Sequence, residues 1–225
     1  MNLAPSAWSF ATRPPPLPAD EVHLWRANLP HADLPRLQPH LSSCELIRAE
    51  RFHFAADRER FIAARGILRQ VLAGYLDLAP ENLRFTAGPH GRPELAGICS
   101  ALRFNLSHSG DLMLLAVAHT RAIGVDLELM QDNVPFQTLA DHYFEPEQAW
   151  KLRLLPPAER AATFYDLWTS TEACLKASGL GLSKGTRVAE PDRWSLRKLM
   201  PAPGYAAALA VEGGSYELNT WSWLN

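Results

Sequence analysis

Apolar and polar positions along the chain predict a mixture of strands and two long amphipathic helices. Residues 22–29 ("VHLWRANL") alternate like a strand, and further strands are expected near 101–106, 112–118 and 122–128. Apolar side chains recur at helical spacing over 57–79, with Asp57 as a candidate N-cap and Pro80 beyond the end. The rest of the chain is expected to form short helices over 134–155, a long helix over 159–178 and strands at 205–211 and 215–223.

This order of elements indicates two similar halves. Each half offers a long amphipathic helix, a turn containing glycine and paired strands, although residue identities are too sparse to establish a sequence repeat. We therefore expect an α+β protein whose two α+β halves pack side by side with a cleft between them. The expected division is an N-terminal arm over 1–20, containing the helix-breaking "RPPPLP", then halves over 21–119 and 120–225.

Composition narrows the class of protein. The 225 residues carry a formal net charge of −2, which gives no electrostatic reason to expect a nucleic-acid partner. Cys44, Cys99 and Cys174 are widely spaced and match no metal-ligand pattern, as expected in a reducing cytoplasm. No apolar stretch has the length of a membrane span, and no signal peptide is evident. We expect a cytoplasmic protein with no membrane partner.

Two carboxylates interrupt the apolar strand "IGVDLE" at 123–128. Because strand side chains alternate between faces, Asp126 and Glu128 share one face, roughly 7 Å apart. Their mutual repulsion and desolvation are unfavourable unless a cation compensates. Gly124 lies on the same face and is expected to leave room for a ligand. The alternative is a solvated edge strand with an acidic outer face.

A second acidic position lies in "FYDLWTSTEACLKASGLGL" at 164–182. Trp168, Glu172 and Lys176 recur every four residues and so line one strip of a helix. Glu172 and Lys176 are compatible with an ordinary surface ion pair. Alternatively, Glu172 meets the two strand carboxylates, and three oxygen ligands without His or Cys favour Mg²⁺.

Polar and basic residues of the first half are suited to phosphate oxygens. In "FNLSHSGDL" at 104–112, Ser107 offers a hydroxyl and His108 an imidazole, although a simple hairpin turn explains the same residues. Several arginines precede them, most beside acidic residues on what are expected to be solvated helix faces. One or two of these guanidinium groups are candidates for a bidentate phosphate contact.

Together, "GRP", "FNLSHSG", "IGVDLE" and the 164–182 stretch resemble, in order and spacing, the 4′-phosphopantetheinyl transferases of the larger, two-half type that includes the surfactin-synthetase activator. The resemblance runs from about 22 to about 182. It implies a pseudo-dimeric α+β fold with coenzyme A in the cleft. It also implies transfer of the phosphopantetheine arm from coenzyme A to a serine of an apo acyl or peptidyl carrier protein, with Mg²⁺ (or Mn²⁺ as an alternative) as cofactor and adenosine 3′,5′-bisphosphate released.

The resemblance also assigns roles to individual residues. Metal-binding positions of the family match Asp126, Glu128 and Glu172. Its coenzyme A contacts match Arg48, Gly91, Arg92, Ser107, His108 and Lys176, with Arg48 at the position that binds the 3′-phosphate and Arg51 as a weaker candidate. The family motif W-x-x-K-E-x-x-x-K carries lysine where this chain has Thr171, a change expected to affect rate or partner contact only. Whether Glu147 adds a further carboxylate stays open.

The implied chemistry assigns catalysis to Glu172 and Lys176. A serine hydroxyl is a weak nucleophile and needs a base, for which Glu172 is preferred and a metal-bound hydroxide is the competing candidate. Two other classes share part of the pattern. A non-catalytic module that binds coenzyme A needs no carboxylate triad, whereas a metal-dependent phosphodiesterase would transfer the arm to water. If one chain contains both halves of the cleft, a monomer suffices.

Overall fold

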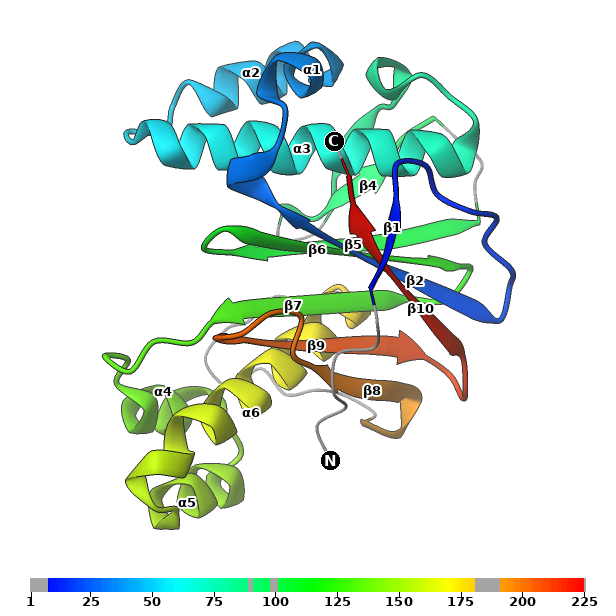
Figure 1. Cartoon of the computed structure of the whole chain (residues 1–225). Helices are drawn as coiled ribbons and strands as arrows, with labels where there is room; N and C mark the ends of the chain where they lie inside the picture. The colour runs from blue at the N-terminus through cyan, green and yellow to red at the C-terminus, as the bar shows by residue number, and fades with distance from the viewer. Residues whose placement is uncertain (1–7, 89–90, 98–100, 181–190, 225) are drawn as a thin grey trace.

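The computed structural model describes residues 8–88, 91–97, 101–180 and 191–224. Figure 1 shows four layers: helix, sheet, sheet and helix. The upper sheet has five strands in the order β1-β10-β2-β6-β5, and the lower sheet has three in the order β7-β9-β8. The strands of the upper sheet are β1 (Ser9–Ala11), β10 (Glu217–Trp223), β2 (Glu21–Asn28), β6 (Leu112–His119) and β5 (Leu102–Ser109). Those of the lower sheet are β7 (Ile123–Leu129), β9 (Tyr205–Glu212) and β8 (Trp194–Leu199).

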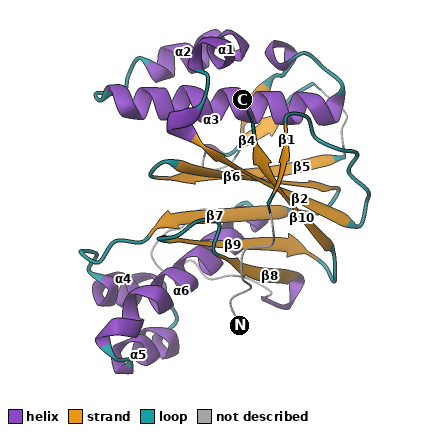
Figure 2. Ribbon diagram, in the orientation of Figure 1, coloured by secondary structure: helices purple, strands orange, loops and turns teal. Residues whose placement is uncertain are grey.

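Each sheet is covered on its outer face by a helix of 22 residues, α3 (Ala55–Leu76) above and α6 (Pro157–Ser178) below. Short helices complete each half: α1 (Leu34–Leu37) and α2 (Ser43–Ala49) above, α4 (Phe136–Tyr143) and α5 (Pro146–Leu154) below. A small hairpin of β3 (Phe85–Ala87) and β4 (Pro93–Leu95) lies near α3 (Figure 2). The two 22-residue helices match the long helices expected from apolar periodicity.

The two halves share one topology. In the first half, β2 is followed by α3 and then by the hairpin β5–β6, with β6 in the centre of the three strands. In the second half, β7 is followed by α6 and then by β8–β9, with β9 in the centre. In both, the long helix ends at a left-handed residue, Asp77 (φ 51°) or Gly179 (φ 77°). The predicted pair of similar α+β halves is confirmed.

Apolar side chains join the layers. One buried cluster fills the space between α3 and the upper sheet, including Trp25, Ile67 and Leu115. A second joins the two sheets face to face, with Leu114 of β6 against Val125 of β7 and Leu209 of β9. A third lies between the lower sheet and α6. The almost wholly apolar β6 is buried on both faces because it is covered by α3 on one side and by the lower sheet on the other.

The expected boundary at 119/120 does not separate the two sheets. The last strand, β10, runs parallel to β2 and joins the upper sheet, and β1 of the expected arm pairs with its other edge. Trp221 stacks on Trp25 with ring centroids 5.9 Å apart, which fixes β10 against the first half. The alternation in the C-terminal segment therefore predicts the strand correctly but does not specify which sheet receives it.

The start of helix α3 differs from the sequence expectation. The N-cap of α3 is Phe54, not Asp57, which instead lies in the first helical turn and pairs with Arg60.

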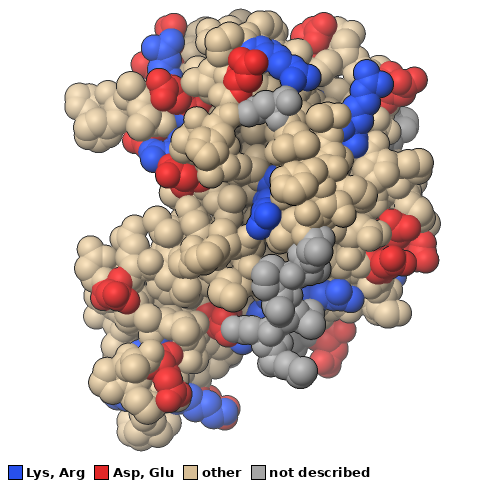
Figure 3. All heavy atoms as spheres, viewed as in Figure 1, with Lys and Arg blue, Asp and Glu red and all other residues tan. Residues whose placement is uncertain are grey.

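Cys44 and Cys174 are free thiols, and Cys99 lies outside the described residues. In the described part of the chain, no helix combines the length and apolarity needed to cross a membrane. Acidic and basic side chains are interspersed over the face shown in Figure 3.

Candidate active site

Strands β5 and β7, each at the edge of its own sheet, lie side by side and are joined by side chains. Polar side chains at every second position of β5 accept hydrogen bonds from main-chain N–H groups of β7. The pairs are Asn105 Oδ1 with Val125 N (2.9 Å), Ser107 Oγ with Leu127 N (3.2 Å) and Ser109 Oγ with Leu129 N (3.0 Å). These hydrogen bonds pair main-chain N–H groups at the edge of β7 that would otherwise be buried without an acceptor.

The hairpin turn considered for this segment is present, but it lies after Ser107 and His108. Ser107 and His108 both lie within β5, and the turn follows at Gly110, whose φ of +55° favours glycine. Because successive strand residues face opposite sides, Ser107 is buried against β7 whereas His108 is exposed. Asn-x-Ser-x-Ser alternation was the sequence signal for the β5–β7 junction, which sequence reasoning missed.

Ser107, Asp126 and Lys176 meet at the junction of the two halves. The ammonium Nζ of Lys176 lies 2.6 Å from Oδ1 of Asp126 and 3.1 Å from Oγ of Ser107. The Ser107 hydroxyl donates to Asp126 Oδ1 (3.2 Å), so its one donor and both acceptor sites are used. Asp126 is 4% exposed, and its other oxygen, Oδ2, is buried with no hydrogen-bond partner.

The two glutamates lie in the electrostatic field of the same cluster. Burial and the charge of Asp126 raise the pKa of Glu128, against the opposing effects of hydrogen bonds from Ser109 and Trp168 and the charge of Lys176. Burial raises the pKa of Glu172 as well, together with the charges of Asp126 and Glu128, while Lys176 acts in the opposite direction. Trp168, Glu172 and Lys176 therefore all act on the acidic face of β7, as the helical spacing predicts.

The donor set fits a divalent cation, although the carboxylates are not gathered around one point. Among the described residues, no group of three His, Cys, Asp or Glu side chains is arranged to hold a metal ion. However, the unpartnered Oδ2 of Asp126 is a buried acceptor, and burial, followed by the charge of Asp126, raises the pKa values of Glu128 and Glu172. Carboxylate oxygens are the ligands that Mg²⁺ prefers.

Gly124 does not make room for a ligand, contrary to the sequence expectation. A Cβ atom at this position would collide with the carbonyl oxygen of Ala173 and would lie 2.5 Å from the backbone nitrogen of Ala177. Glycine is therefore required because the backbone of α6 packs directly on β7. This close approach is what brings Glu172 and Lys176 to the acidic strand.

A pocket on the first half is lined by two arginines, one of which acts electrostatically on His108 of β5. The pocket has a volume of about 700 Å³ and is lined by Cys44, Ile47, Arg48, Arg51 and Phe52. The pKa of the His108 imidazole is lowered, first by desolvation next to the surrounding protein and then by the positive charges of Lys176 and Arg48. Arg48, His108 and Lys176 are thus close enough to interact electrostatically, although they come from α2, β5 and α6.

Arg92 connects the halves through main-chain carbonyls. Its guanidinium donates to the carbonyl of Lys176 (2.7 Å) and to that of Phe104 (3.2 Å), and burial lowers its pKa. The neighbouring Gly91 has φ +77°, a conformation that favours glycine. In this structure Arg92 holds the end of α6 to β5, and its contact with a phosphate stays a prediction.

Comparisons with known proteins decide the family. Residues 25–120 match the family described as "4′-phosphopantetheinyl transferase, N-terminal", and residues 122–210 match the 4′-phosphopantetheinyl transferase superfamily. The chain is 41% identical over 231 residues to the 4′-phosphopantetheinyl transferase HetI of Nostoc sp., covering 95% of this chain and 98% of the relative. The chain belongs to the 4′-phosphopantetheinyl transferase family.

Other relatives agree with this membership. A putative 4′-phosphopantetheinyl transferase of Synechocystis sp. is 38% identical over 76% of this chain and 70% of its own length. The 4′-phosphopantetheinyl transferase Sfp of Bacillus subtilis is 28% identical over 60% of this chain and 59% of its own length. The resemblance drawn from the four motifs is confirmed, as is the assignment of the protein as an enzyme of this family.

Two positions left open by the motifs can be located in this transferase. Glu147 lies on the exposed side of α5, where it pairs with Lys151 (2.7 Å), and its pKa is lowered by that hydrogen bond and charge. The structure therefore gives no support to Glu147 as a further carboxylate of the site. Thr171 is half-buried on α6, one residue before Glu172. The final residues of the long motif, 181 and 182, lie outside the described residues.

Proposed function

We propose that this transferase moves the 4′-phosphopantetheine arm of coenzyme A onto a serine of an apo acyl or peptidyl carrier protein, with Mg²⁺ as cofactor. The serine oxygen forms a new bond to phosphorus, the pyrophosphate P–O bond breaks, and adenosine 3′,5′-bisphosphate leaves. The proton of the serine hydroxyl passes to a base. Membership of the family supports the transfer reaction, and the site supports the finer assignments.

The observation that carries the proposal is the meeting of Ser107, Asp126 and Lys176 at one point. They come from β5, β7 and α6, so both halves must fold together before the site exists. The cluster places a buried, half-partnered carboxylate beside an ammonium group. A carboxylate that can bind a cation, next to an ammonium group that can contact a phosphate, suits the cleavage of a pyrophosphate because both stabilise the negative charge that develops.

Basic residues are proposed to bind the nucleotide part of coenzyme A. Arg48 and Arg51 line a pocket of about 700 Å³, within the size range of small-molecule sites. Arg48 is assigned to the 3′-phosphate, and His108 and Lys176 to the pyrophosphate, because the three share one electrostatic neighbourhood. Guanidinium and ammonium groups stabilise phosphate oxygens by charge-assisted hydrogen bonds.

Asp126, Glu128 and Glu172 are proposed to hold the metal, with Mn²⁺ as an alternative to Mg²⁺. When bound, the ion would withdraw negative charge from the pyrophosphate and from the departing bisphosphate. Glu172 is proposed as the base because it lies on the half-buried strip of α6 beside Lys176, where a carboxylate can accept the serine proton. With the ion bound, the ammonium group of Lys176 would share its contacts between Asp126 and the phosphate oxygens, which it would stabilise.

Intact-protein mass spectrometry tests this function directly. The purified protein is incubated with Mg²⁺, coenzyme A and an apo carrier protein, and with the same carrier in which the acceptor serine is replaced by alanine. A mass gain of one phosphopantetheine on the first carrier only, lost in EDTA, is the expected result. Hydrolysis of coenzyme A without a mass gain would identify a phosphodiesterase. If neither product forms, the protein would be a binding module without catalytic activity. A panel of carriers then identifies the acceptor.

A further inference from the structure

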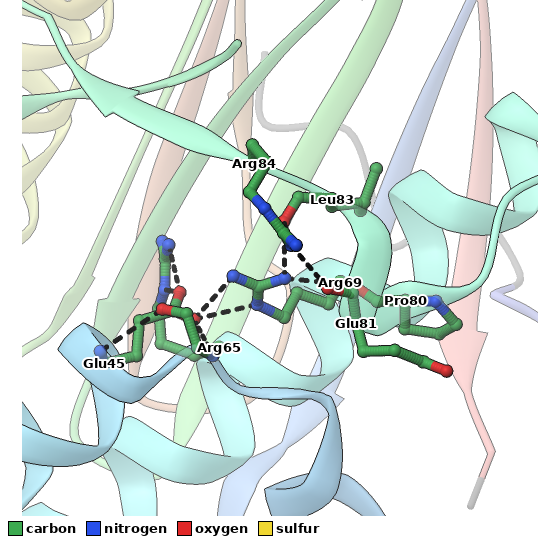
Figure 4. A network of polar contacts seen from close by, with 8 residues as sticks. Glu45, Arg65, Arg69, Pro80, Glu81, Leu83 and Arg84 are labelled. Atoms are coloured by element: carbon green, nitrogen blue, oxygen red, sulfur yellow. Dashed lines mark hydrogen bonds and ion pairs between the residues drawn. The ribbon is translucent and has the colours of Figure 1, made fainter. Parts of the chain in front are cut away.

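The carboxylate of Glu45 lies buried where α2 meets α3, in contact with Arg65 and Arg69 (Figure 4). Arg65 Nε donates to Oε1 of Glu45 at 2.6 Å, and Arg69 Nε donates to Oε2 at 2.8 Å. The main-chain N–H of Ser42 also donates to Oε2, at 2.8 Å, which completes the capping box of α2. Glu45 therefore accepts hydrogen bonds from its own helix start and from two arginines of α3.

The arginine partners are themselves fixed. Arg69 is 2% exposed, and its Nη1 donates to the carbonyls of Pro80 and Leu83 at 3.0 Å each. Arg65 and Arg69 both lie over the ring of Phe85. Glu45 thus connects α2 to two arginines that make further contacts within the first half, so a change in the length or charge of its side chain acts on the position of α2.

Apart from Glu45, helix α2 contacts α3 through a small apolar cluster and through Arg48, whose guanidinium lies 5.4 Å from the centroid of the Phe61 ring. Helix α2 is seven residues long, too short to be stable alone, and only Ala49 and Leu46 of this helix join the small apolar cluster with Ile62 and Phe61. Its exposed side carries Cys44, Ile47 and Arg48, which line the pocket of about 700 Å³. The buried side and the pocket side of one short helix are therefore linked through Glu45.

Glu45 also balances charge in this region. Arg48 lies close enough to Arg65 for the two positive charges to interact, and Arg69 adds a third. Glu45 is the carboxylate bound to Arg65 and Arg69, so it offsets the repulsion that would move α2 away from α3. Removing its charge leaves Arg69 buried without its anion, and the helix that carries Arg48 loses its ion pairs with α3.

We propose that Glu45 is a positioning residue for nucleotide recognition: held by Arg65 and Arg69, it fixes α2 so that Arg48 meets the 3′-phosphate of coenzyme A. This inference rests on the proposed function. It does not require Glu45 to touch the substrate. It concerns binding of one phosphate, so the effect falls on the KM for coenzyme A and not on the chemical step.

Steady-state kinetics with two donors test the proposal. Dephospho-coenzyme A lacks only the 3′-phosphate, so the ratio of its KM to that of coenzyme A reports the contact assigned to Arg48. The variants are Glu45→Gln, Arg65→Lys, Arg48→Ala as the reference, and Glu50→Gln as a matched control. Glu50 is an exposed glutamate at the end of the same helix. Thermal melting of each variant monitors folding.

Glu45→Gln is expected to raise the KM for coenzyme A about tenfold, the loss of one charge-assisted contact, with kcat within about twofold. The KM for dephospho-coenzyme A should stay near that of the parent, as in Arg48→Ala. Arg65→Lys should give a smaller change in the same direction. This variant tests the same contact if Glu45→Gln fails to fold. Glu50→Gln should behave as the parent.

Two results would overturn the proposal. If Glu45→Gln or Arg65→Lys keeps the parent's preference for coenzyme A over dephospho-coenzyme A, α2 does not depend on this contact. If both donors lose activity equally in kcat, the role of Glu45 is general stability. Failure of the proposed function is distinguishable, because the parent itself would then transfer no phosphopantetheine from either donor.

Discussion

Lys176 Nζ contacts Asp126 Oδ1 at 2.6 Å, so helix α6 supplies a cation to the buried carboxylate of β7. The sequence indicates that the same-face pair Asp126 and Glu128 needs a positive charge, and the chain provides one itself. One ammonium group faces three carboxylates, because Glu172 lies in the same field. Burial, followed by the charges of neighbouring carboxylates, raises the pKa of both glutamates, and the charge of Lys176 acts in the opposite direction.

This contact predicts that Asp126 contributes to stability in the absence of metal. Asp126→Ala should lower the free energy of unfolding in EDTA by about 1–3 kcal/mol, between the values for exposed and buried pairs, because Lys176 is partly exposed. Asp166→Ala is the matched control, since it removes the partner of Lys198 from a more exposed pair between α6 and β8. Urea denaturation compares the two. An Asp126 variant as stable as the parent would show that relief of carboxylate repulsion outweighs the lost pair.

Catalysis should depend on Glu172 and not on Glu147. Glu172→Gln keeps the size of the side chain but removes the charge, so kcat should fall about 10²–10⁴-fold at saturating Mg²⁺. Glu147→Gln should leave kcat unchanged because that carboxylate is exposed and pairs with Lys151 on α5. Initial rates of transfer at saturating coenzyme A and apo carrier provide the measurement. Near-parent activity of Glu172→Gln would place the base elsewhere.

Gly124 should tolerate no side chain. In Gly124→Ala the new Cβ meets the backbone of α6 at Ala173 and Ala177, so α6 must move away from β7. We expect a loss of about 1–3 kcal/mol in stability, as for overpacked cores, together with reduced transfer. Gly214→Ala, where a Cβ meets nothing within 4 Å, is the control and should be close to neutral. Equal thermal melting of the two variants would contradict this packing.

Stability should decrease on mild acidification because of His23. Burial lowers the pKa of this imidazole below 6.5, although the hydrogen bond and charge of Glu21 act in the opposite direction. Its ring nitrogens contact Tyr75 of α3 and Glu21, and its ring lies against Trp221 of β10. Between the lowered pKa and 6.5 the unfolded chain binds the proton more readily, so the stabilising effect is complete above 6.5 and is lost as pH falls through this window.

Urea denaturation from about pH 7.5 to about pH 5.5 measures this dependence for the parent and for His23→Gln. The variant cannot titrate at this position, so its stability should fall less steeply over the same range. An equal slope in both proteins would mean that other groups carry the dependence.

The sequence by itself determined the elements that follow from side-chain periodicity. Long apolar stripes specify α3 and α6, and alternation specifies β2, β7 and β10, because burial of one face is a local property of the pattern. It also singled out Asp126, Glu128 and Glu172 as carboxylates in apolar surroundings, and the structure places them close enough for their charges to interact. The short elements α2 and β8 were not predicted, because a segment of six or seven residues contains too few positions to show a clear periodic pattern.

Only the tertiary structure decided how these pieces meet. Alternation cannot say that β10 pairs with β2, that Asn105, Ser107 and Ser109 bond to the edge of β7, or that Gly124 admits the backbone of α6. Each of these depends on surfaces brought together from distant parts of the chain. The contacts of Lys176 with Asp126, and of Glu45 with two arginines of α3, follow from that packing. Periodicity reports which face is buried, and the partner of that face is fixed only when the whole chain folds.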